Sequence, residues 1–331
     1  MFDEGVETIS TISTQASYSS SRFEPCYLKL SRSGELAERI QRAFRQMERC
    51  DLCARYCYVN RLVTIAGAVC RTGEHAVVHS FGPHHGEEDV LKGWKGSGTI
   101  FFSWCNLRCV YCQNWEISQK GAGRPTQPRE IAAMMLELQE LGCHNINFVS
   151  PSHVVAQILA AINIAAEKGL RLPLVYNTGG YDSLEALALL DGVIDIYMPD
   201  MKYGDGEIAR THSKVRNYVE VNQAAVKAMH RQVGDLVLDD KGLAQRGLLI
   251  RHLVLPGNLA GSKKVLAFIA NEISRNTYLN LMDQYQPCFR ANKYPPLDRS
   301  ITAEEFRAAL SLADKYGLRR LDRRLSTEWQ M

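Results

Sequence analysis

Cys105, Cys109 and Cys112 are the residues of this sequence whose type and spacing are best suited to chemistry, and they directly follow an apolar run at 99–104. Three thiolates can hold three irons of a [4Fe–4S] cube, which leaves the fourth iron without a protein ligand. The spacing therefore predicts a cluster with one iron open to a further ligand. A structural zinc site that takes its fourth ligand from elsewhere is the alternative interpretation.

A second group of cysteines precedes the triplet and consists of Cys50, Cys53, Cys57 and Cys70. Four thiolates can close a tetrahedral zinc site or hold a second iron–sulfur cluster, and the spacing does not separate the two. Unmetallated thiols are the third alternative. In a reducing compartment, cysteines clustered in this way indicate metal binding more readily than disulfides.

Six short β-rich runs alternate with amphipathic helical patterns in the rest of the chain. Strands that alternate with helices predict a parallel sheet covered by helices, so the expected fold class is α/β, a partial (β/α)6 barrel with an N-terminal cysteine-rich extension. In such barrels the chemistry lies at the carboxyl ends of the strands, where the cysteine triplet is expected. The runs are 99–103, 144–149, 172–177, 194–199, 248–254 and 278–282.

The expected domain organisation has four parts. Residues 1–34 contain many Ser and Thr residues and are predicted to be a mobile tail, because few large apolar groups offset the entropy of ordering. Residues 35–98 are expected to form a helix and a cysteine-rich metal-binding segment. The partial barrel is expected over 99–300, followed by a C-terminal helix over 301–331.

The composition excludes several classes of function. The net charge of +3 over 331 residues is too small to indicate a nucleic-acid partner. The longest nearly apolar stretch, 154–166, is shorter than the ~20 residues of a membrane-spanning helix, so no membrane association is expected. The first residues show neither a basic start nor an apolar signal core, and a cytoplasmic location is therefore expected.

Several motifs resemble those of the radical S-adenosylmethionine (SAM) superfamily, and within it the uncharacterised homologues of pyruvate formate-lyase activating enzymes. The resemblance implies that SAM binds the open iron of the cluster and that a low-potential electron donor, flavodoxin or ferredoxin, supplies one electron. Reductive cleavage of SAM then yields a 5′-deoxyadenosyl radical, which abstracts hydrogen from a substrate. Besides the triplet, the motifs lie at 96–102, 112–114, 144–147, 176–181, 195–202 and 251–257.

The resemblance also implies which residues contact SAM. Asn177 matches a polar position at the end of the third strand, and Asp200 and Lys202 match an Asp-x-Lys pair suited to the ribose hydroxyls and the carboxylate. Arg251 matches a basic residue that can hold the same carboxylate. Tyr111, between two cluster ligands, is expected to contact the adenine.

One part of the expected SAM site departs from the activating enzymes. Where those enzymes carry a Gly-Gly-Glu turn that meets the amino group of SAM, this chain has Ser150 and Ser152. A hydroxyl or a carbonyl oxygen can still accept from an ammonium group, but the carboxylate is missing and the contact should be weaker.

Two substrate classes follow from these observations. In the first, the protein makes a glycyl radical on a partner enzyme, as the activating enzymes do. In the second, the radical acts on a small molecule such as a sugar, for example as an epimerase, and a cysteine returns hydrogen; Cys288, after the last strand, is the candidate donor. A third interpretation, an iron–sulfur electron carrier, does not explain the residues expected around SAM.

Overall fold

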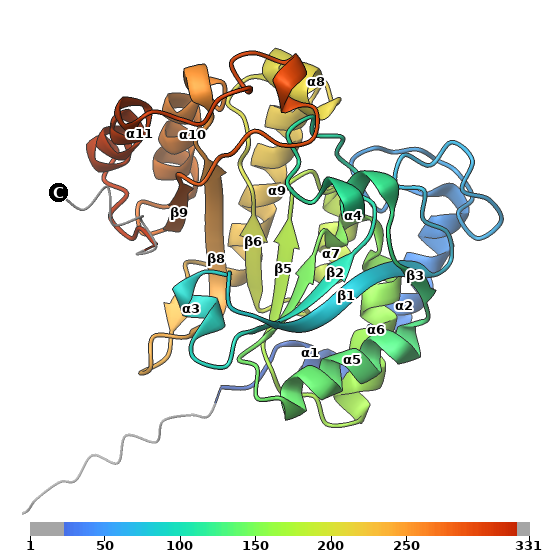
Figure 1. Ribbon diagram of the computed structural model, residues 1–331. Coiled ribbons are helices and arrows are strands. Elements are labelled where there is room, and N and C mark those ends of the chain that lie inside the picture. The colour runs from blue at the N-terminus through green and yellow to red at the C-terminus, as the bar shows by residue number, and fades with distance from the viewer. Residues whose placement is uncertain (1–22, 323–331) are drawn as a thin grey trace, which may run out of the picture.

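The structure is a computed structural model that describes residues 23–322, and a nine-stranded sheet forms its centre (Figure 1). The strand order is β3-β1-β2-β4-β5-β6-β8-β7, and β9 pairs with β8. The strands are β1 (Ala76–His84), β2 (Ser97–Phe102), β3 (Arg124–Thr126), β4 (Ile146–Val149), β5 (Leu174–Thr178), β6 (Ile196–Pro199), β7 (Val237–Leu238), β8 (Ala244–Leu253) and β9 (Tyr278–Met282).

Six of these strands are parallel and coincide with the six predicted runs: β2, β4, β5, β6, β8 and β9. The predicted α/β class with a partial barrel is confirmed. Within residues 23–322 no pairing joins β9 to β3, so the barrel is open.

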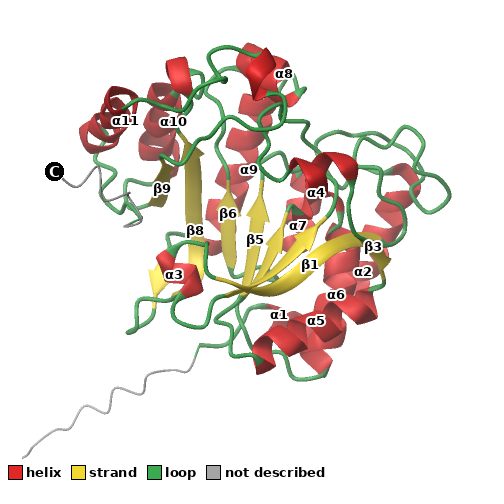
Figure 2. Ribbon diagram, in the orientation of Figure 1, coloured by secondary structure: helices red, strands yellow, loops and turns green. Residues whose placement is uncertain are grey.

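The helices lie mainly on the outer side of the sheet (Figure 2). They are α1 (Tyr27–Ser33), α2 (Glu35–Gln46), α3 (Asp89–Lys92), α4 (Trp115–Lys120), α5 (Pro128–Glu140), α6 (Val155–Glu167), α7 (Leu184–Leu190), α8 (Gly206–Ser213), α9 (Tyr218–Val233), α10 (Ser262–Phe268) and α11 (Ala303–Lys315). Among the described residues, no helix has both the length and the apolar character needed to cross a bilayer.

Helix α1 packs into the core, although its segment was expected to be mobile. Tyr27 is fully buried, and its hydroxyl donates to the Leu172 carbonyl oxygen at 3.1 Å. The Cys26 backbone N–H donates to Asp195 Oδ1 at 2.9 Å. Burial raises the pKa of the Asp195 carboxyl to about 6, and the two backbone N–H groups that it accepts from, those of Cys26 and Leu174, act in the opposite direction. These contacts fix the start of the described chain against β5 and β6.

The predicted boundaries therefore need two corrections. The mobile tail expected over 1–34 is wrong for Tyr27–Ser33, because buried apolar contacts there offset the cost of ordering the chain; residues 1–22 lie outside the described part. The segment 35–98 also contributes β1, which pairs antiparallel with β2, so it belongs to the sheet and is more than a separate extension.

Candidate active site

The cysteine triplet lies in the loop that joins β2 to α4. The backbone N–H groups of Arg108 and Val110 donate to the carbonyl oxygens of Ser213 and His212 at 3.1 and 2.8 Å, which ties the loop to the end of α8. Because β2 is parallel to its neighbour β4, this loop lies at the edge of the sheet where the other parallel strands end.

All three triplet cysteines line one cavity of about 150 Å³, as the sequence predicted from their position. Two serines contact their sulfurs: Ser213 Oγ lies 2.9 Å from Cys109 Sγ, and Ser118 Oγ lies 3.2 Å from Cys112 Sγ. The spacing of the cysteines gave no sign of these serines, because Ser213 comes from α8, which is remote in sequence.

Burial disfavours the thiolate form of the triplet, and a cation acts against that effect. Burial raises the pKa of the Cys105 thiol to about 12 and also raises the pKa values of Cys109 and Cys112. The Lys202 ammonium lowers the pKa values of all three thiols. Since the thiolate is the form that binds metals, Lys202 favours ligation by the triplet.

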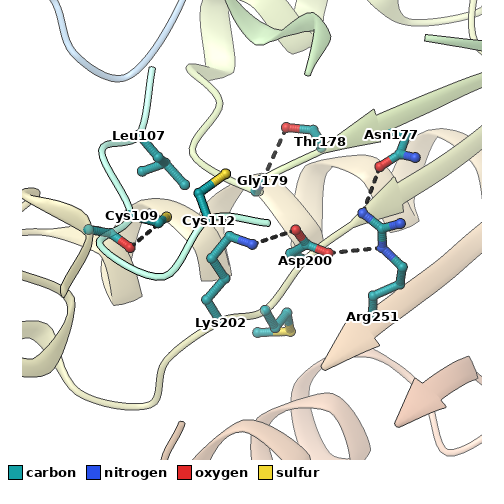
Figure 3. Close-up of polar contacts among 12 residues, drawn as sticks. Leu107, Cys109, Cys112, Asn177, Thr178, Gly179, Asp200, Lys202 and Arg251 are labelled. Atoms are coloured by element: carbon teal, nitrogen blue, oxygen red, sulfur yellow. Dashed lines mark hydrogen bonds and ion pairs between the residues drawn. The ribbon is translucent and has the colours of Figure 1, made fainter. Parts of the chain in front are cut away.

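Polar side chains from three strand ends form the opposite wall of the cavity (Figure 3). Asp200 accepts from Lys202 Nζ at 2.6 Å and from Arg251 Nε at 2.9 Å. Arg251 Nη2 donates to Asn177 Oδ1 at 2.7 Å. The structure thus brings together the four residues that the sequence placed at the ends of β5, β6 and β8.

The two cations keep Asp200 ionised. Burial alone would raise the pKa of this carboxyl, but the Arg251 and Lys202 charges bring it below its ordinary value. Asp200 and Lys202 therefore form the simple ion pair that their spacing permitted, and both still line the cavity.

Ser150 and Ser152 have different positions. Ser150 lines the cavity, and its backbone has φ +59°, a left-handed conformation uncommon for a residue with a side chain. Ser152 is buried instead, and its hydroxyl lies 2.9 Å from Thr178 Oγ1, which itself donates to Asp182. The structure therefore does not bring the Ser152 side chain to the cavity, because it belongs to a polar network beneath it.

Tyr111 was expected to contact the adenine, but its ring lies in a cluster of tyrosines. Its hydroxyl lies 2.7 Å from the Tyr203 hydroxyl, and its ring meets those of Tyr203 and Tyr285 edge-on. The side chain is buried and is not among those that line the cavity. The structure thus gives the Tyr111 ring a packing role, the alternative expected of a large aromatic group.

Cys288 is not among the described residues that line the cavity of the triplet. It is half-buried and precedes Phe289, whose ring stacks on that of Trp115 at 5.3 Å. The Arg290 backbone N–H donates to the Val110 carbonyl oxygen at 2.9 Å. The segment around Cys288 therefore packs on the outside of the triplet loop.

The second cysteine group surrounds a buried arginine. Arg61 is 2% exposed, and its Nη1 donates to Cys50 Sγ at 3.4 Å. Burial alone would lower the pKa of Arg61, and the neighbouring Cys70, Cys50 and Cys53 raise it above its ordinary value. Cys57, the fourth predicted ligand, is half-buried and is not among these neighbours.

Several residues that line the cavity were not predicted from the sequence: Leu107, Asn114, Ser118, Gln119, Val149, Thr178 and Gly179. The Gly-Gly pair in the 176–181 motif indicated part of this lining in the sequence, because glycines often allow a close approach of two backbone segments. Gly180 has φ +73°, and a Cβ there would lie 2.3 Å from the Asp200 carbonyl oxygen. A glycine is therefore required in the turn after β5, where the chain passes close to the backbone of Asp200.

The donor set fits a cluster held by three thiols with a polar ligand beside it. Three thiols face one cavity, and cationic, anionic and amide groups face it from the other side. Among the described residues, no group of three or more Cys, His, Asp or Glu side chains that could hold a metal ion is found, at the triplet or at the second cysteine group.

Comparison with known proteins identifies the family. The model of the radical SAM superfamily matches residues 99–239. An uncharacterized protein of Methanocaldococcus jannaschii is 35% identical over 277 residues, which cover 81% of this chain and 75% of that protein. The chain belongs to the radical SAM superfamily, and membership of this superfamily implies a [4Fe–4S] cluster and SAM as cofactors.

Two solved structures are also similar. A radical SAM methyltransferase from Sphaerobacter thermophilus has a TM-score of 0.46 and 12% identity, covering 68% of this chain and 67% of that one. The FeFe-hydrogenase maturase HydG from Carboxydothermus hydrogenoformans has a TM-score of 0.44 and 14% identity, covering 87% of this chain and 66% of that one.

Replacing Asp200 should destabilise the fold in a pH-dependent way. At pH 7, Asp200→Asn leaves Lys202 and Arg251 without their shared carboxylate and should lower the free energy of unfolding by about 3 kcal/mol. Because the folded-state pKa of Asp200 is depressed, its contribution is present above the unfolded-state pKa and is lost as pH falls through the folded-state pKa. The difference between wild type and variant should therefore shrink with acid, as measured by urea denaturation.

The control for this prediction is Asp240→Asn, at an exposed turn residue, which should leave the unfolding free energy at pH 7 within about 0.5 kcal/mol of wild type. Equal stability of Asp200→Asn and Asp240→Asn at pH 7 would contradict the role given to Asp200.

Proposed function

We propose that this radical SAM enzyme removes a hydrogen atom from its substrate without returning one, in the manner of the glycyl-radical-enzyme activating enzymes that it resembles. One observation carries the proposal: the triplet and Asn177, Asp200, Lys202 and Arg251 line the same cavity from separate elements. A purely structural metal site would not need this polar wall.

The residues of the cavity fit the two bound groups. Cys105, Cys109 and Cys112 would hold the cluster. Lys202 and Arg251 would hold the carboxylate of SAM, and Asp200 would accept from its hydroxyl or ammonium groups. When bound, the cluster and SAM supply the 5′-deoxyadenosyl radical after one electron arrives from a flavodoxin or a ferredoxin.

Removal of a hydrogen atom that is not returned to the substrate agrees with where the cysteines outside the triplet lie. An epimerase needs a hydrogen donor beside the substrate, and the expected donor was Cys288. Among the described residues, no cysteine besides the triplet lines the cavity. A glycyl radical formed on a partner protein requires no such donor.

The first test is anaerobic reconstitution with iron and sulfide, followed by reduction with dithionite in the presence of SAM. Wild type should bind about four irons at the triplet and yield 5′-deoxyadenosine, whereas Cys109→Ala should lose both. Cys143→Ala, at a buried cysteine outside the cavity, is the matched control and should retain both. A fully loaded cluster that forms no 5′-deoxyadenosine would sink the proposal.

A second test follows the hydrogen. Turnover in heavy water with candidate substrates should put no solvent deuterium into a small-molecule product, and an organic radical signal should appear on a separate protein. Solvent deuterium in a product, lost in Cys288→Ala, would instead establish the epimerase alternative. Mass spectrometry and electron paramagnetic resonance give the two measurements.

We also propose that the second cysteine group binds a metal, zinc or an iron–sulfur cluster. The buried guanidinium of Arg61 supports this, because it stays protonated and donates to two carbonyl oxygens and to Cys50 Sγ, and no described carboxylate forms an ion pair with it. Neutral thiols would leave its charge uncompensated, whereas metal-bound thiolates of Cys50, Cys53 and Cys70 would balance it. Cys57 remains the predicted fourth ligand.

Metal analysis tests this site separately from the triplet. A chain with all three triplet cysteines changed to alanine should still retain zinc or iron after EDTA treatment. Adding Cys70→Ala, or Arg61→Leu, should release it, and adding Arg129→Gln at an exposed arginine should not. A triplet-free chain that carries no metal before EDTA treatment would contradict the proposal.

A further inference from the structure

A second cavity, of about 480 Å³, lies on the outer side of the triplet loop and contains an unusual concentration of positive charge. Five of its nine lining residues are cations, and none is an acid. A cavity of this size is in the range that encloses small ligands. The cations are Arg71, Arg108, Lys120, Lys214 and Arg290.

Each of the five cations rests on an aromatic ring. Arg71 and Arg108 share the Trp104 ring, at 5.2 and 5.8 Å from its centroid. The other three pairs are Lys120 on Trp115 at 4.2 Å, Arg290 on Phe289 at 5.0 Å and Lys214 on Tyr294 at 5.1 Å. These contacts position the charges without neutralising them.

Carboxylates are nearly absent from the surroundings of these cations. Among residues 23–322, only Lys120 of the five has an ion-pair partner, Glu116 at 3.4 Å. The side chains of Arg71 and Arg290 make no hydrogen bond to any described acceptor, so their donors remain available. Arg108 donates to Gln119 and to the Val69 carbonyl oxygen, and Lys214 donates to the Thr211 carbonyl oxygen and the Tyr294 hydroxyl, so none of their partners carries a negative charge.

Bringing like charges together costs free energy unless a ligand compensates for it. Two aromatic residues that position the cations also have strained backbones, Trp104 with φ +67° and Phe289 with φ +55°. Bulky residues rarely adopt this conformation, and such strain is concentrated at functional sites. A surface built for stability alone would place acids among these cations.

The cavity adjoins the candidate active site. Arg108 and Val110, which line it, flank Cys109 in the sequence. Gln119 lines both cavities, and its Oε1 accepts from Arg108 Nη1 at 3.2 Å. A ligand seated here would therefore lie on the opposite side of the triplet loop from the cavity of Asp200.

We propose that this cavity is a binding site for a small ligand that carries two or more phosphoryl groups. Planar guanidinium groups match phosphate oxygens in pairs, and two of them, those of Arg71 and Arg290, have free donors. Five cations around one open cavity favour a multiply charged anion over a single carboxylate. The concave shape favours a small molecule over the surface of an acidic protein.

Calorimetric titration of the full chain with inorganic pyrophosphate, at constant ionic strength, tests this site. Wild type should bind one pyrophosphate, and Arg71→Gln combined with Arg290→Gln should weaken binding about 100-fold. Arg71→Lys combined with Arg290→Lys keeps the charge but not the planar fork and should give an intermediate affinity. The matched control is Arg129→Gln combined with Arg231→Gln, two exposed arginines away from the cavity, which should bind like wild type.

Equal pyrophosphate affinity in the cavity variant and in the control variant would overturn the proposal. Tighter binding of a poly-glutamate peptide than of pyrophosphate would also overturn it and would assign the cavity to an acidic protein. Circular dichroism of each variant shows whether it is folded. Because the titration does not depend on SAM cleavage, its failure is distinct from failure of the proposed radical chemistry.

Discussion

The position of Asp200 determines how the strand ends of this protein meet. Its backbone N–H donates to the Thr178 carbonyl oxygen on β5, and its carbonyl oxygen accepts from the Tyr218 hydroxyl on α9. Its carboxylate joins Lys202 to Arg251 on β8. One residue therefore connects three neighbouring strand ends and a helix, and the polar wall opposite the triplet depends on it. Removing one partner of a buried ion pair leaves the other charge uncompensated, which costs free energy. Asp200, Lys202 and Arg251 therefore stabilise one another, and the loss of any one of them should disturb the whole polar wall.

The cations on the two sides of the triplet loop have different partners. On the inner side, Lys202 and Arg251 share the carboxylate of Asp200, and Arg251 also lies 4.0 Å from Glu87. On the outer side the cations rest on aromatic rings and mostly lack acids. The inner arrangement combines two cations with two carboxylates and suits a ligand that itself carries both a carboxylate and an ammonium group, as SAM does. The outer arrangement keeps its charge for a ligand that is itself strongly negative.

The sequence predicted the parts of the site that depend on local spacing and strand order. The triplet, Asp200 and Lys202 follow predicted strands, Asn177 and Arg251 lie within the last residues of two others, and parallel strands bring their ends to one edge. It did not predict the contacts that depend on tertiary packing: Ser213 reaches Cys109 from α8, and β1 pairs with β2 from the segment 35–98, which was expected to form only a helix and a cysteine-rich extension. The Tyr111 ring turns into a tyrosine cluster for the same reason, since its surroundings come from elements far along the chain.

Charge balance at the thiols links these features. Burial raises the pKa values of the Cys105, Cys109 and Cys112 thiols, and the ammonium group of Lys202 in the inner cavity lowers them. From the outer side, Arg108 lies close enough to Cys105 for that thiol to raise the pKa of the guanidinium, although burial lowers it overall. Two cations, Lys202 on the inner side and Arg108 on the outer side, therefore flank the triplet loop, and Lys202 favours the thiolates that iron requires.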